Sequence, residues 1–556
     1  MYPEILHAQQ VILLFQERGI RNIVISPGSR NAPLTIGFSE NDFFNCYSIV
    51  DERCAAHVAL GMAQQLQKPV AVLCTSGSAL LNYYPAIAEA YYSEIPLIVL
   101  SADRPLHKID IGDGQTIRQQ HVYANHILYD TQLEMITSLQ DKEGIATNER
   151  WINKAINTAI SKYGPVHINI PFEEPLYSRV KTPSLQVKVI NLLKDESTAI
   201  PDRFTAQWKT AKKKLVILAT LNPPVLNKED LDILTSDPSV LVMSEVSSNV
   251  VHEKVIWSID TLIAPIEREE DQIQDLQPDL VITIGGMIVS KKIKQFLRRF
   301  ETKAHYHVGK RRAYDTFFKL AGHIQVKPQK WVHHLPEVTM KSTYQKRWMQ
   351  HFHGCLVKRA DYFAQMPWSD FKVFELIFSR LPDAIVLQLG NSSTIRYAQL
   401  FQMNATHTVF SNRGTSGIDG STSTAIGAAM AIDQPVVLIT GDLSFFYDSN
   451  ALWNNYIPKN FKIILINNSG GGIFRILPGH KDTKVFDTYF ETKHQLTAQH
   501  LCRMHGVNYK SISKQNAFAK ACKKLFSSND QPQLLEIFTP RQINDAVLLD
   551  YFKVLK

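Results

Sequence analysis

Short runs of apolar residues, each ending in a loop of small and polar residues, recur through this chain of 556 residues. Such runs are typical of buried strands in parallel sheets, because helices that join parallel strands cover both sheet faces. The first third of the chain contains four of them: Ile23–Ile25, Val70–Cys74, Leu97–Leu100 and Val166–Ile170. Helical patterns separate the runs, so the sequence predicts a doubly wound α/β domain with its sites at the carboxyl ends of the strands.

The same pattern continues in two further parts of the chain, and the expected strands are Leu215–Ala219, Val240–Met243, Leu280–Ile284, His305–Val308, Ile385–Leu389, Val436–Thr440, Ile463–Ile466 and Leu534–Ile537. A polar stretch from Tyr177 to Lys214 and a helical connection from Gln325 to Met366 separate the three groups. The fold class predicted is therefore α/β, with three doubly wound parallel-sheet domains at residues 1–180, 200–340 and 365–556.

The charge, the cysteines and the apolar runs of the chain argue against nucleic-acid-binding, secreted and membrane proteins. The net charge of +8 comes without a long Lys/Arg block, so no nucleic-acid partner is expected, although the charge is compatible with acidic substrates. The six cysteines form no C-x-x-C pair, which favours a reducing, cytoplasmic location. The sequence contains no signal peptide and no apolar run of membrane-spanning length, so no membrane span is predicted.

The strongest local motif lies in the third group of strands. Gly441 and Asp442 follow one apolar run, a helix is expected at Asp448–Tyr456, and Asn468 and Gly470 follow the next apolar run, with Asn468 26 positions after Asp442. In a parallel βαβ unit this spacing places both loops at one sheet edge. A carboxylate, an amide oxygen and the Gly470 carbonyl are the hard oxygen ligands that Mg²⁺ prefers, and glycines let the backbone approach a diphosphate. The alternative is a plain strand–turn–helix with a buried cap at Asp442.

Residues 441–472 resemble the thiamine-diphosphate (ThDP)/Mg²⁺ motif, which begins with Gly-Asp and ends in Asn. The resemblance implies domains of the ThDP-dependent decarboxylase type: aminopyrimidine-binding at 1–180, central at 200–340 and diphosphate-binding at 365–556. It also implies ThDP and Mg²⁺ (or Mn²⁺) as cofactors, a homodimer or homotetramer with active sites at subunit interfaces, and metal ligands at Asp442, Asn468 and Gly470. The cofactor-binding residues it implies are Glu52, Ser392, Ser416, Ile418, Gly441, Asp442, Ser444, Asn468, Gly470 and Gly471.

A carboxylate must hydrogen-bond the cofactor's aminopyrimidine ring so that the thiazolium C2 proton can leave. Glu52 follows a strand-like run and precedes the predicted helix Ala55–Gln65, as the activating glutamate does in ThDP enzymes. The alternative is that Asp51 or Glu52 only charges a helix N-terminus. Ile418 resembles the apolar residue that bends the cofactor, and it could equally be an ordinary core residue.

Seven segments spread over nearly the whole chain together resemble the menaquinone-pathway 2-succinyl-5-enolpyruvyl-6-hydroxy-3-cyclohexene-1-carboxylate (SEPHCHC) synthase family: Ser26–Leu34, Ser101–Pro105, Gly114–Gln119, Gly390–Ser392, Ser411–Gly414, Ser416–Gly420 and Gly441–Phe445. This family condenses 2-oxoglutarate with isochorismate and releases CO₂, so the resemblance implies a ThDP-dependent carboligase, a transferase. Two positions depart from the pattern. Gly114 stands where some members have Asn, and Lys292 stands where Arg can occur, which removes a bidentate fork.

Four arginines agree with acidic substrates, since they recur in the predicted strand-end loops and a guanidinium binds a carboxylate with two hydrogen bonds: Arg30, Arg104, Arg396 and Arg413. The catalytic residues that the resemblance implies are Glu52, Gln115, Arg30 and Arg396. The substrate-binding residues that it implies are Ser29, Arg30, Arg104, Gln115, Lys291, Lys292, Ser392, Arg396, Arg413, Phe474 and Leu477. Each arginine could instead be a surface charge, Lys291 and Lys292 a solvated helix face continuing to Lys294, and the two apolar residues plain packing.

Two other functions remain open from the sequence. One is a different ThDP enzyme, such as an acetolactate-synthase-like carboligase or another 2-oxo-acid decarboxylase. The other is a ThDP-binding relative without activity, against which the intact Glu52, Asp442 and Asn468 speak. The middle domain has no G-x-G-x-x-G after its strands, so no flavin is predicted.

Overall fold

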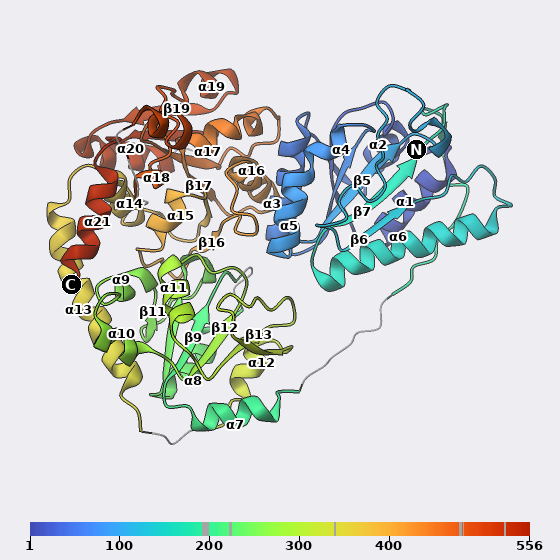
Figure 1. The fold of residues 1–556 in the computed structure, drawn as a ribbon. Coiled ribbons are helices and arrows are strands. Elements are labelled where there is room, and N and C mark those ends of the chain that lie inside the picture. The colour runs from blue at the N-terminus through green and yellow to red at the C-terminus, as the bar shows by residue number, and fades with distance from the viewer. Residues whose placement is uncertain (192–198, 222–224, 338–340, 477–480, 482, 528–529) are drawn as a thin grey trace. The chain divides into compact units, whose positions relative to one another are not determined.

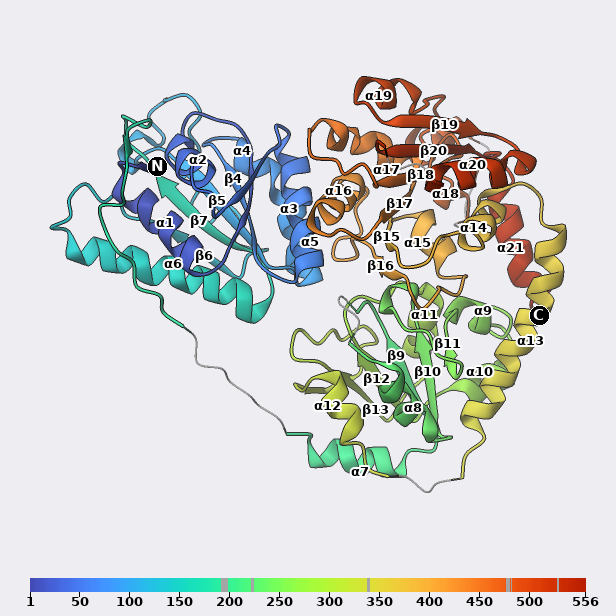
Figure 2. The same ribbon diagram turned by 180° about the vertical axis from the view of Figure 1, so that it is seen from behind.

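The computed structural model describes the chain except residues 192–198, 222–224, 338–340, 477–480, 482 and 528–529. Its residues cluster into two compact units. The first unit consists of Met1–Lys194, Gly414–Gln434 and Phe446–Phe461, and the second of Asp195–Arg413, Pro435–Phe445 and Lys462–Lys556. Figures 1 and 2 show the elements of each unit from opposite sides. No helix in the described ranges is both long and apolar enough to cross a bilayer.

A six-stranded parallel sheet forms the centre of the first unit, with strands in the order β3-β2-β4-β5-β7-β6. The bounds of these strands are Asn45–Ser48, Asn22–Ile25, Val70–Cys74, Leu97–Asp103, Val166–Pro171 and Tyr129–Gln132. The first unit also contains a separate two-stranded antiparallel sheet, formed by β1 (Tyr2–Pro3) and β8 (Arg179–Val180). The helices of the unit are α1 Leu6–Glu17, α2 Ala32–Ser39, α3 Glu52–Leu66, α4 Ala79–Asn82, α5 Tyr84–Ser93, α6 Lys142–Lys162 and α16 Ser421–Ala431.

Helices α1, α2 and α6 contribute apolar side chains to one core with alternate residues of the sheet, and α3 contacts strands β2, β4 and β5 (Figure 1). Strands β4, β5 and β7 are buried along their whole length, as covering on both faces requires. Helix α3 starts at Glu52 because the Asp51 side chain accepts a hydrogen bond from Cys54 N at 3.1 Å and caps the helix. This capped start fixes the backbone of the predicted activating glutamate.

The second unit contains two parallel sheets. The first has the order β11-β10-β9-β12-β13-β14, with bounds Val255–Ile256, Val240–Ser244, Lys214–Leu218, Leu280–Ile284, Ala304–Val308 and Leu320–Ile324. The helices around it and after it are α7 Asp202–Thr210, α8 Lys228–Ser236, α9 Ile259–Ile263, α10 Glu270–Leu276, α11 Lys291–Arg299, α12 Pro328–His333 and α13 Tyr344–Gln365.

The second sheet of this unit has the order β16-β15-β17-β18-β20-β19, with bounds Thr408–Phe410, Val386–Leu389, Val436–Gly441, Lys462–Asn467, Gln533–Phe538 and Asn508–Ile512. Its helices are α14 Asp370–Phe378, α15 Ser393–Ala398, α17 Asp442–Tyr447 (whose last residues belong to the first unit), α18 Ile473–Ile476, α19 Gln499–Met504, α20 Gln515–Ser527 and α21 Asn544–Val554. Buried residues of α14, α15, α20 and α21 pack against β15, β17, β18 and β20.

Three six-stranded parallel sheets confirm the predicted α/β fold class, and every apolar run predicted as a strand is one within a residue or a few at its ends. One local prediction is wrong. A helix was expected at Asp448–Tyr456, but α17 starts at Asp442, directly after β17, and residues 449–452 form only a short 3-10 turn. Asp448 instead accepts hydrogen bonds from Ser423 N and Oγ, which ties it to the start of α16.

Candidate active site

The loops after β17 and β18 meet at one edge of their sheet. The two strands are parallel neighbours, with Gly441 opposite Ile466. Asp442 is buried, and its Oδ2 accepts a hydrogen bond from Gly470 N at 3.0 Å while Oδ1 accepts one from Leu443 N at 2.7 Å. The predicted proximity of the Gly-Asp pair and the Asn-Gly loop is therefore present in the structure.

Asn468, the second predicted metal ligand, is buried with its amide in a fixed orientation. Its Nδ2 donates to Asp370 Oδ2 at 2.8 Å. Its Oδ1 is buried, and within the described residues it has no hydrogen-bond partner. Buried polar atoms in proteins are almost always paired, so this oxygen is an available ligand position. The Gly470 carbonyl accepts a hydrogen bond from Gly472 N at 3.0 Å and keeps a second lone pair.

The glycines at this edge of the sheet differ in how much space lies around them. Gly470 has φ 154°, and a side-chain carbon there would lie 2.8 Å from the Glu491 carbonyl oxygen, so the chain's own packing demands glycine. At Gly441 an added carbon would meet no protein atom within 4 Å among the described residues. The open space over Gly441 is what a bound group lying against the backbone needs. Gly471 is closer to its surroundings, with Phe474 at 3.1 Å from an added carbon.

Two residues near this edge escaped the sequence reasoning. His494 Nε2 lies 3.2 Å from Asp442 Oδ2, and its backbone N donates to Ser469 O. Glu491 is fully buried, binds Arg475 with both carboxylate oxygens, contacts Arg541, and accepts a hydrogen bond from Gly471 N on its carbonyl. The segment after Gly470 is thus tied back onto the glycine loop. No spacing in the sequence relates positions 491 and 494 to the motif, because the intervening loop has no regular period.

Arg396 and Arg413 both reach the turn at residues 391–392. Arg396 Nη1 donates to Ser392 O at 2.6 Å, and Arg413 Nη1 donates to Asn391 Oδ1 at 2.7 Å. Ser392 has φ 63° and ψ −123°, a strained region for a residue with a side chain. Such strain persists only where surrounding contacts impose it, and it is common at functional sites. The structure therefore brings together three of the predicted substrate-binding residues.

Two acidic residues, Glu245 directly after β10 and Asp260 in α9, lie near these arginines. Burial raises the pKa of Glu245 to about 7, although hydrogen bonds from Ser290 N and Val289 N oppose the shift and Arg413 favours the charged form. Burial likewise raises the pKa of Asp260, against a hydrogen bond from the Ser290 hydroxyl and the nearby charges of Lys292 and Arg396. Two buried carboxylates thus lie within electrostatic reach of the two arginines.

The predicted lysine pair lies at the start of α11, where the Ser290 side chain caps Ile293 N. Lys291 is exposed, whereas Lys292 Nζ binds Glu267 Oε2 at 2.6 Å and lies over the Phe552 ring. Lys294, on the next turn, is the lysine whose pKa is lowered by burial and shifted by the charges of Glu245 and Arg413. Lys294 lies one helical turn from Lys291 and is a third candidate, whereas the sequence indicated it only as part of a solvated helix face.

In the first unit, Ser29 and Arg30 follow β2. Ser29 is exposed, while Arg30 is buried and donates to Phe172 O at 3.0 Å and to Glu174 Oε1 at 3.1 Å. Arg30 therefore connects the loop after β2 to the loop after β7. The Glu174 side chain is 65% exposed, whereas that of Arg30 is 5% exposed.

Arg104 and Gln115 lie in loops that contact each other. Arg104 Nε donates to Gly114 O at 3.2 Å, and Gln115, which is exposed, has φ 56°. An added carbon at Gly114 would meet nothing within 4 Å among the described residues, so the departure from Asn changes no packing in this chain.

Glu52, at the first position of α3, is half-buried, and its Oε2 accepts a hydrogen bond from Asn82 Nδ2 at 3.3 Å. Both neighbours are anchored: Asp51 Oδ2 accepts from Asn450 Nδ2 at 2.8 Å, and Arg53 donates to Tyr447 O and lies 3.8 Å from Asp448. Sequence reasoning missed Asp448 and Asn450, since they come from a distant part of the chain.

The remaining predicted residues have simpler surroundings. Ser416 has φ 61°, Ile418 is half-buried in the same loop, and Ser444 is buried in the first turn of α17. Phe474, in α18, is 36% exposed and lies edge-on to Phe490. Leu477 lies outside the described residues.

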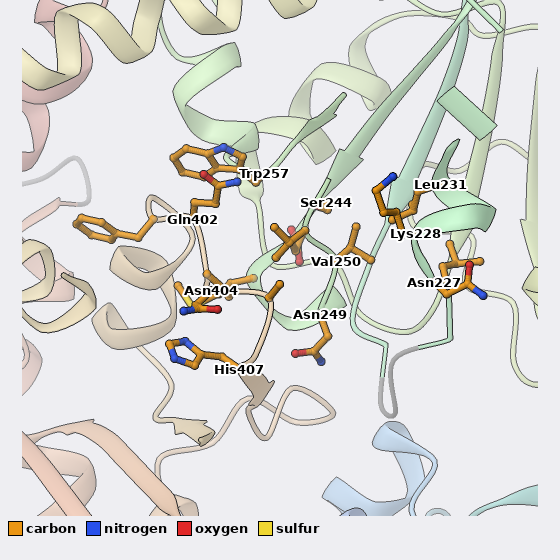
Figure 3. A pocket seen from close by; sticks show the side chains of 17 residues that line it. Asn227, Lys228, Leu231, Ser244, Asn249, Val250, Trp257, Gln402, Asn404 and His407 are labelled. Carbon is orange, nitrogen blue, oxygen red and sulfur yellow. The ribbon is translucent and has the colours of Figure 1, made fainter. Parts of the chain in front are cut away.

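A separate cavity of about 230 Å³ lies within the second unit, between residues 226–257 and residues 401–407 (Figure 3). None of the residues predicted for the site lines it. Its two charged lining residues already have partners, Lys228 with Asp232 and Glu245 with the backbone of Val289 and Ser290. The geometry gives no reason to place a charged ligand there.

Comparison with known proteins identifies the family. Residues 7–129 match the N-terminal TPP binding domain of thiamine pyrophosphate enzymes, and residues 390–537 match the C-terminal TPP binding domain. Proteins named 2-succinyl-5-enolpyruvyl-6-hydroxy-3-cyclohexene-1-carboxylate synthase are 52% identical in Flavobacterium psychrophilum, 51% in Flavobacterium johnsoniae and 49% in Christiangramia forsetii, each over 100% of both chains. The chain belongs to the SEPHCHC synthase family of thiamine pyrophosphate enzymes.

Among solved structures, the chain is similar to the crystal structure of benzoylformate decarboxylase from Polynucleobacter necessarius, with a TM-score of 0.72, 16% identity and coverage of 98% of this chain and 99% of that one. At this identity the likeness confirms the fold of the ThDP-dependent decarboxylase type. Among the described residues there is no cluster of three or more His, Cys, Asp or Glu that could hold a metal ion. The oxygen atoms of Asp442, Asn468 and Gly470 fit a hard divalent cation beside a diphosphate. Among them, Asn468 Oδ1 is buried and has no hydrogen-bond partner within the described residues.

Proposed function

We propose that this chain is a SEPHCHC synthase that condenses 2-oxoglutarate with isochorismate, releases CO₂, and thereby serves menaquinone biosynthesis. The observation that carries the proposal is identity of about half of all residues, over the full length, with relatives that bear this name. Two groups of residues support the proposal: those that could hold the cofactor and the arginines that could bind acidic substrates.

Different residues would bind the metal ion, the diphosphate and the aminopyrimidine ring of the cofactor. Asp442 and Asn468 Oδ1 would bind Mg²⁺ or Mn²⁺ together with the Gly470 carbonyl, and Gly441 would leave room for the diphosphate. When bound, ThDP supplies the electron sink that carries the decarboxylation and the new carbon–carbon bond. Glu52 would hold the proton on the aminopyrimidine ring nitrogen, and its place at the start of α3 favours a carboxylate there.

The arginines would orient the two substrates. 2-Oxoglutarate and isochorismate each carry two carboxylates, and planar guanidinium groups bind carboxylates through paired hydrogen bonds. Arg396 and Arg413, joined at the Asn391–Ser392 turn, offer two such groups within one small region. Arg30, Arg104, Gln115 and Ser29 would serve the same purpose from the first unit. Holding both acids in register turns a bimolecular encounter into a positioned reaction.

A cytoplasmic location and a homodimer or homotetramer with active sites at subunit interfaces are part of the same proposal. The six cysteines are all free, which agrees with a reducing compartment. Analytical ultracentrifugation with and without ThDP and Mg²⁺ tests the assembly, and a monomer that turns over at full rate would contradict it.

Release of CO₂ from a panel of 2-oxo acids tests the assignment against other ThDP enzymes. With ThDP, Mg²⁺ and isochorismate present, we expect CO₂ from 2-oxoglutarate and much less from pyruvate or benzoylformate. Preference for pyruvate would instead favour an acetolactate-synthase-like carboligase. Cofactor binding without release from any of the acids would favour a relative without activity.

A further inference from the structure

The side chain of Asn468 can present either its oxygen or its nitrogen towards Asp442 and Gly470, and a neighbouring carboxylate distinguishes the two. Asn468 Nδ2 donates to Asp370 Oδ2 at 2.8 Å, which turns Oδ1 away from Asp370. An ionised carboxylate only accepts hydrogen bonds, so it pairs with the amide nitrogen and repels the amide oxygen. The reverse orientation would place an NH₂ group where a cation needs an oxygen.

Asp370 is itself held from several directions. Its Oδ1 accepts a hydrogen bond from Thr539 Oγ1 at 2.5 Å, and its backbone N donates to Asn544 Oδ1 at 2.8 Å. Thr539 N in turn donates to Asn467 O, at the end of β18. Asp370 is buried at the first position of α14, and burial raises the pKa of its carboxyl to about 6, whereas hydrogen bonds from Thr539 and Asn468 favour the charged form. The carboxylate is thus fixed relative to the strand end that carries Asn468.

We propose that Asp370 is a positioning residue, which fixes the Asn468 amide so that Oδ1 is available to the divalent cation. The inference rests on the proposed function, since it assigns a role towards the cation of that site. Asp370 does not touch the cation itself. It acts by excluding the amide orientation that cannot bind it.

A reciprocal exchange of the two groups tests this assignment without relying on catalysis. The readout is the affinity for Mn²⁺ at saturating ThDP, from the electron paramagnetic resonance of free Mn²⁺, together with the unfolding temperature. In Asp370→Asn both amide orientations become accessible, so Mn²⁺ affinity should fall about 2- to 10-fold. In Asn468→Asp two buried carboxylates would face each other, and affinity should fall by more than about 10-fold despite the added negative charge.

The double variant Asp370→Asn/Asn468→Asp restores a donor at position 370 and an acceptor at position 468. We expect its Mn²⁺ affinity to return to within about 3-fold of wild type, a coupling of more than about 1 kcal/mol between the two sites. Tyr344→Phe is the matched control, since it removes a buried hydrogen bond, from Tyr344 Oη to Leu276 O, in the core of the other sheet of the second unit. It should lower the unfolding temperature and leave Mn²⁺ affinity unchanged.

Several results would overturn the inference. Asn468→Asp could bind Mn²⁺ as tightly as wild type, the double variant could bind no better than Asn468→Asp, or Tyr344→Phe could weaken binding as much as Asp370→Asn. A wild-type chain that binds neither ThDP nor Mn²⁺ would overturn the proposed function and this inference together. ThDP-dependent Mn²⁺ binding that is equal in all variants would overturn the positioning role alone.

Discussion

At the scale of single residues, Glu52 has a fixed backbone and a lightly engaged side chain. Asp51, Arg53 and the capped start of α3 are tied to Tyr447, Asp448 and Asn450, whereas the Glu52 carboxylate meets Asn82 through a long contact of 3.3 Å. Neighbours that hold the backbone while the side chain keeps capacity for a ligand are what a catalytic position requires.

Replacing Glu52 by Gln should therefore abolish turnover and spare cofactor binding. The amide keeps the size of the side chain but cannot hold a proton as a carboxylate does, so turnover should fall about 10²- to 10⁴-fold. Steady-state rates and ThDP binding by fluorescence titration check this. Near-normal turnover would remove Glu52 from the mechanism, and Glu134→Gln, on the exposed surface of the same unit, is a control expected to keep wild-type rates.

At the scale of elements, two glycines allow α3 and α16 to pack closely in the first unit. An added carbon at Gly61 would lie 2.0 Å from Thr424 O, and one at Gly427 would lie 2.0 Å from Val58 O. Each glycine thus faces the backbone of the opposite helix. The packing keeps α16, from late in the chain, against the helix that begins with Glu52.

Gly61→Ala should destabilise the protein by about 2 kcal/mol or more, because the backbone in its way cannot rotate aside as a side chain can. Gly354→Ala is the matched change in α13, where an added carbon meets nothing within 4 Å among the described residues. It should stabilise by up to about 1 kcal/mol through helix propensity. Urea unfolding measures both. Equal effects of the two changes would show that the close packing has no energetic consequence.

The strands also show how far the sequence could predict the elements. Inner strands such as β4 (VAVLC), β12 (LVITI) and β18 (KIILIN) are buried and mostly apolar, so the sequence reveals them directly. Edge strands such as β6 (YDTQ), β14 (LAGHI) and β19 (NYKSI) are partly exposed, and small or polar residues interrupt their apolar residues, so no continuous apolar run marks them. The helix expected at Asp448–Tyr456 was wrong because Asp448 bonds to α16, a tertiary contact that local pattern cannot reveal.

The candidate site divides in the same way. Asp442 and Asn468 follow from the spacing of two inner strands, and the structure places their loops together. Asp370, His494 and Lys294 were not predicted as site residues. The first two reach this edge through the packing of α14 and of an irregular loop, and Lys294 lies one turn beyond the lysine pair. The assignments of substrate residues stay predictions until the ligands are bound.

At the scale of the whole molecule, buried histidines should make the free energy of unfolding depend on pH. Burial lowers the pKa of His7 to about 4, while hydrogen bonds with Pro171 O and Ile136 N oppose the shift. Burial lowers the pKa of His305 to about 4 and that of His307 to about 3 as well. Since these histidines bind protons below pH 6.5 in the unfolded chain and not in the folded one, their contribution to stability is complete above pH 6.5 and is lost as pH drops towards 4. The raised pKa of Glu245 contributes in the opposite direction.

His7→Gln should remove one part of this dependence. Between pH 7.5 and pH 5.0 the wild type should lose about 2 kcal/mol more unfolding free energy than the variant, although the variant starts lower by a hydrogen bond, about 1 kcal/mol. Urea unfolding of the full chain, measured at the two pH values, provides the comparison. Parallel losses in wild type and variant would mean that His7 titrates alike in the folded and unfolded chain.

The most direct test of the central claim is mass spectrometry of the product formed from 2-oxoglutarate and isochorismate with ThDP and Mg²⁺. The account predicts a product with the mass of isochorismate plus 2-oxoglutarate less CO₂, absent when either acid or the cofactor is omitted. Decarboxylation of 2-oxoglutarate with isochorismate recovered unchanged would contradict it, and so would a comparable adduct formed from pyruvate in place of 2-oxoglutarate.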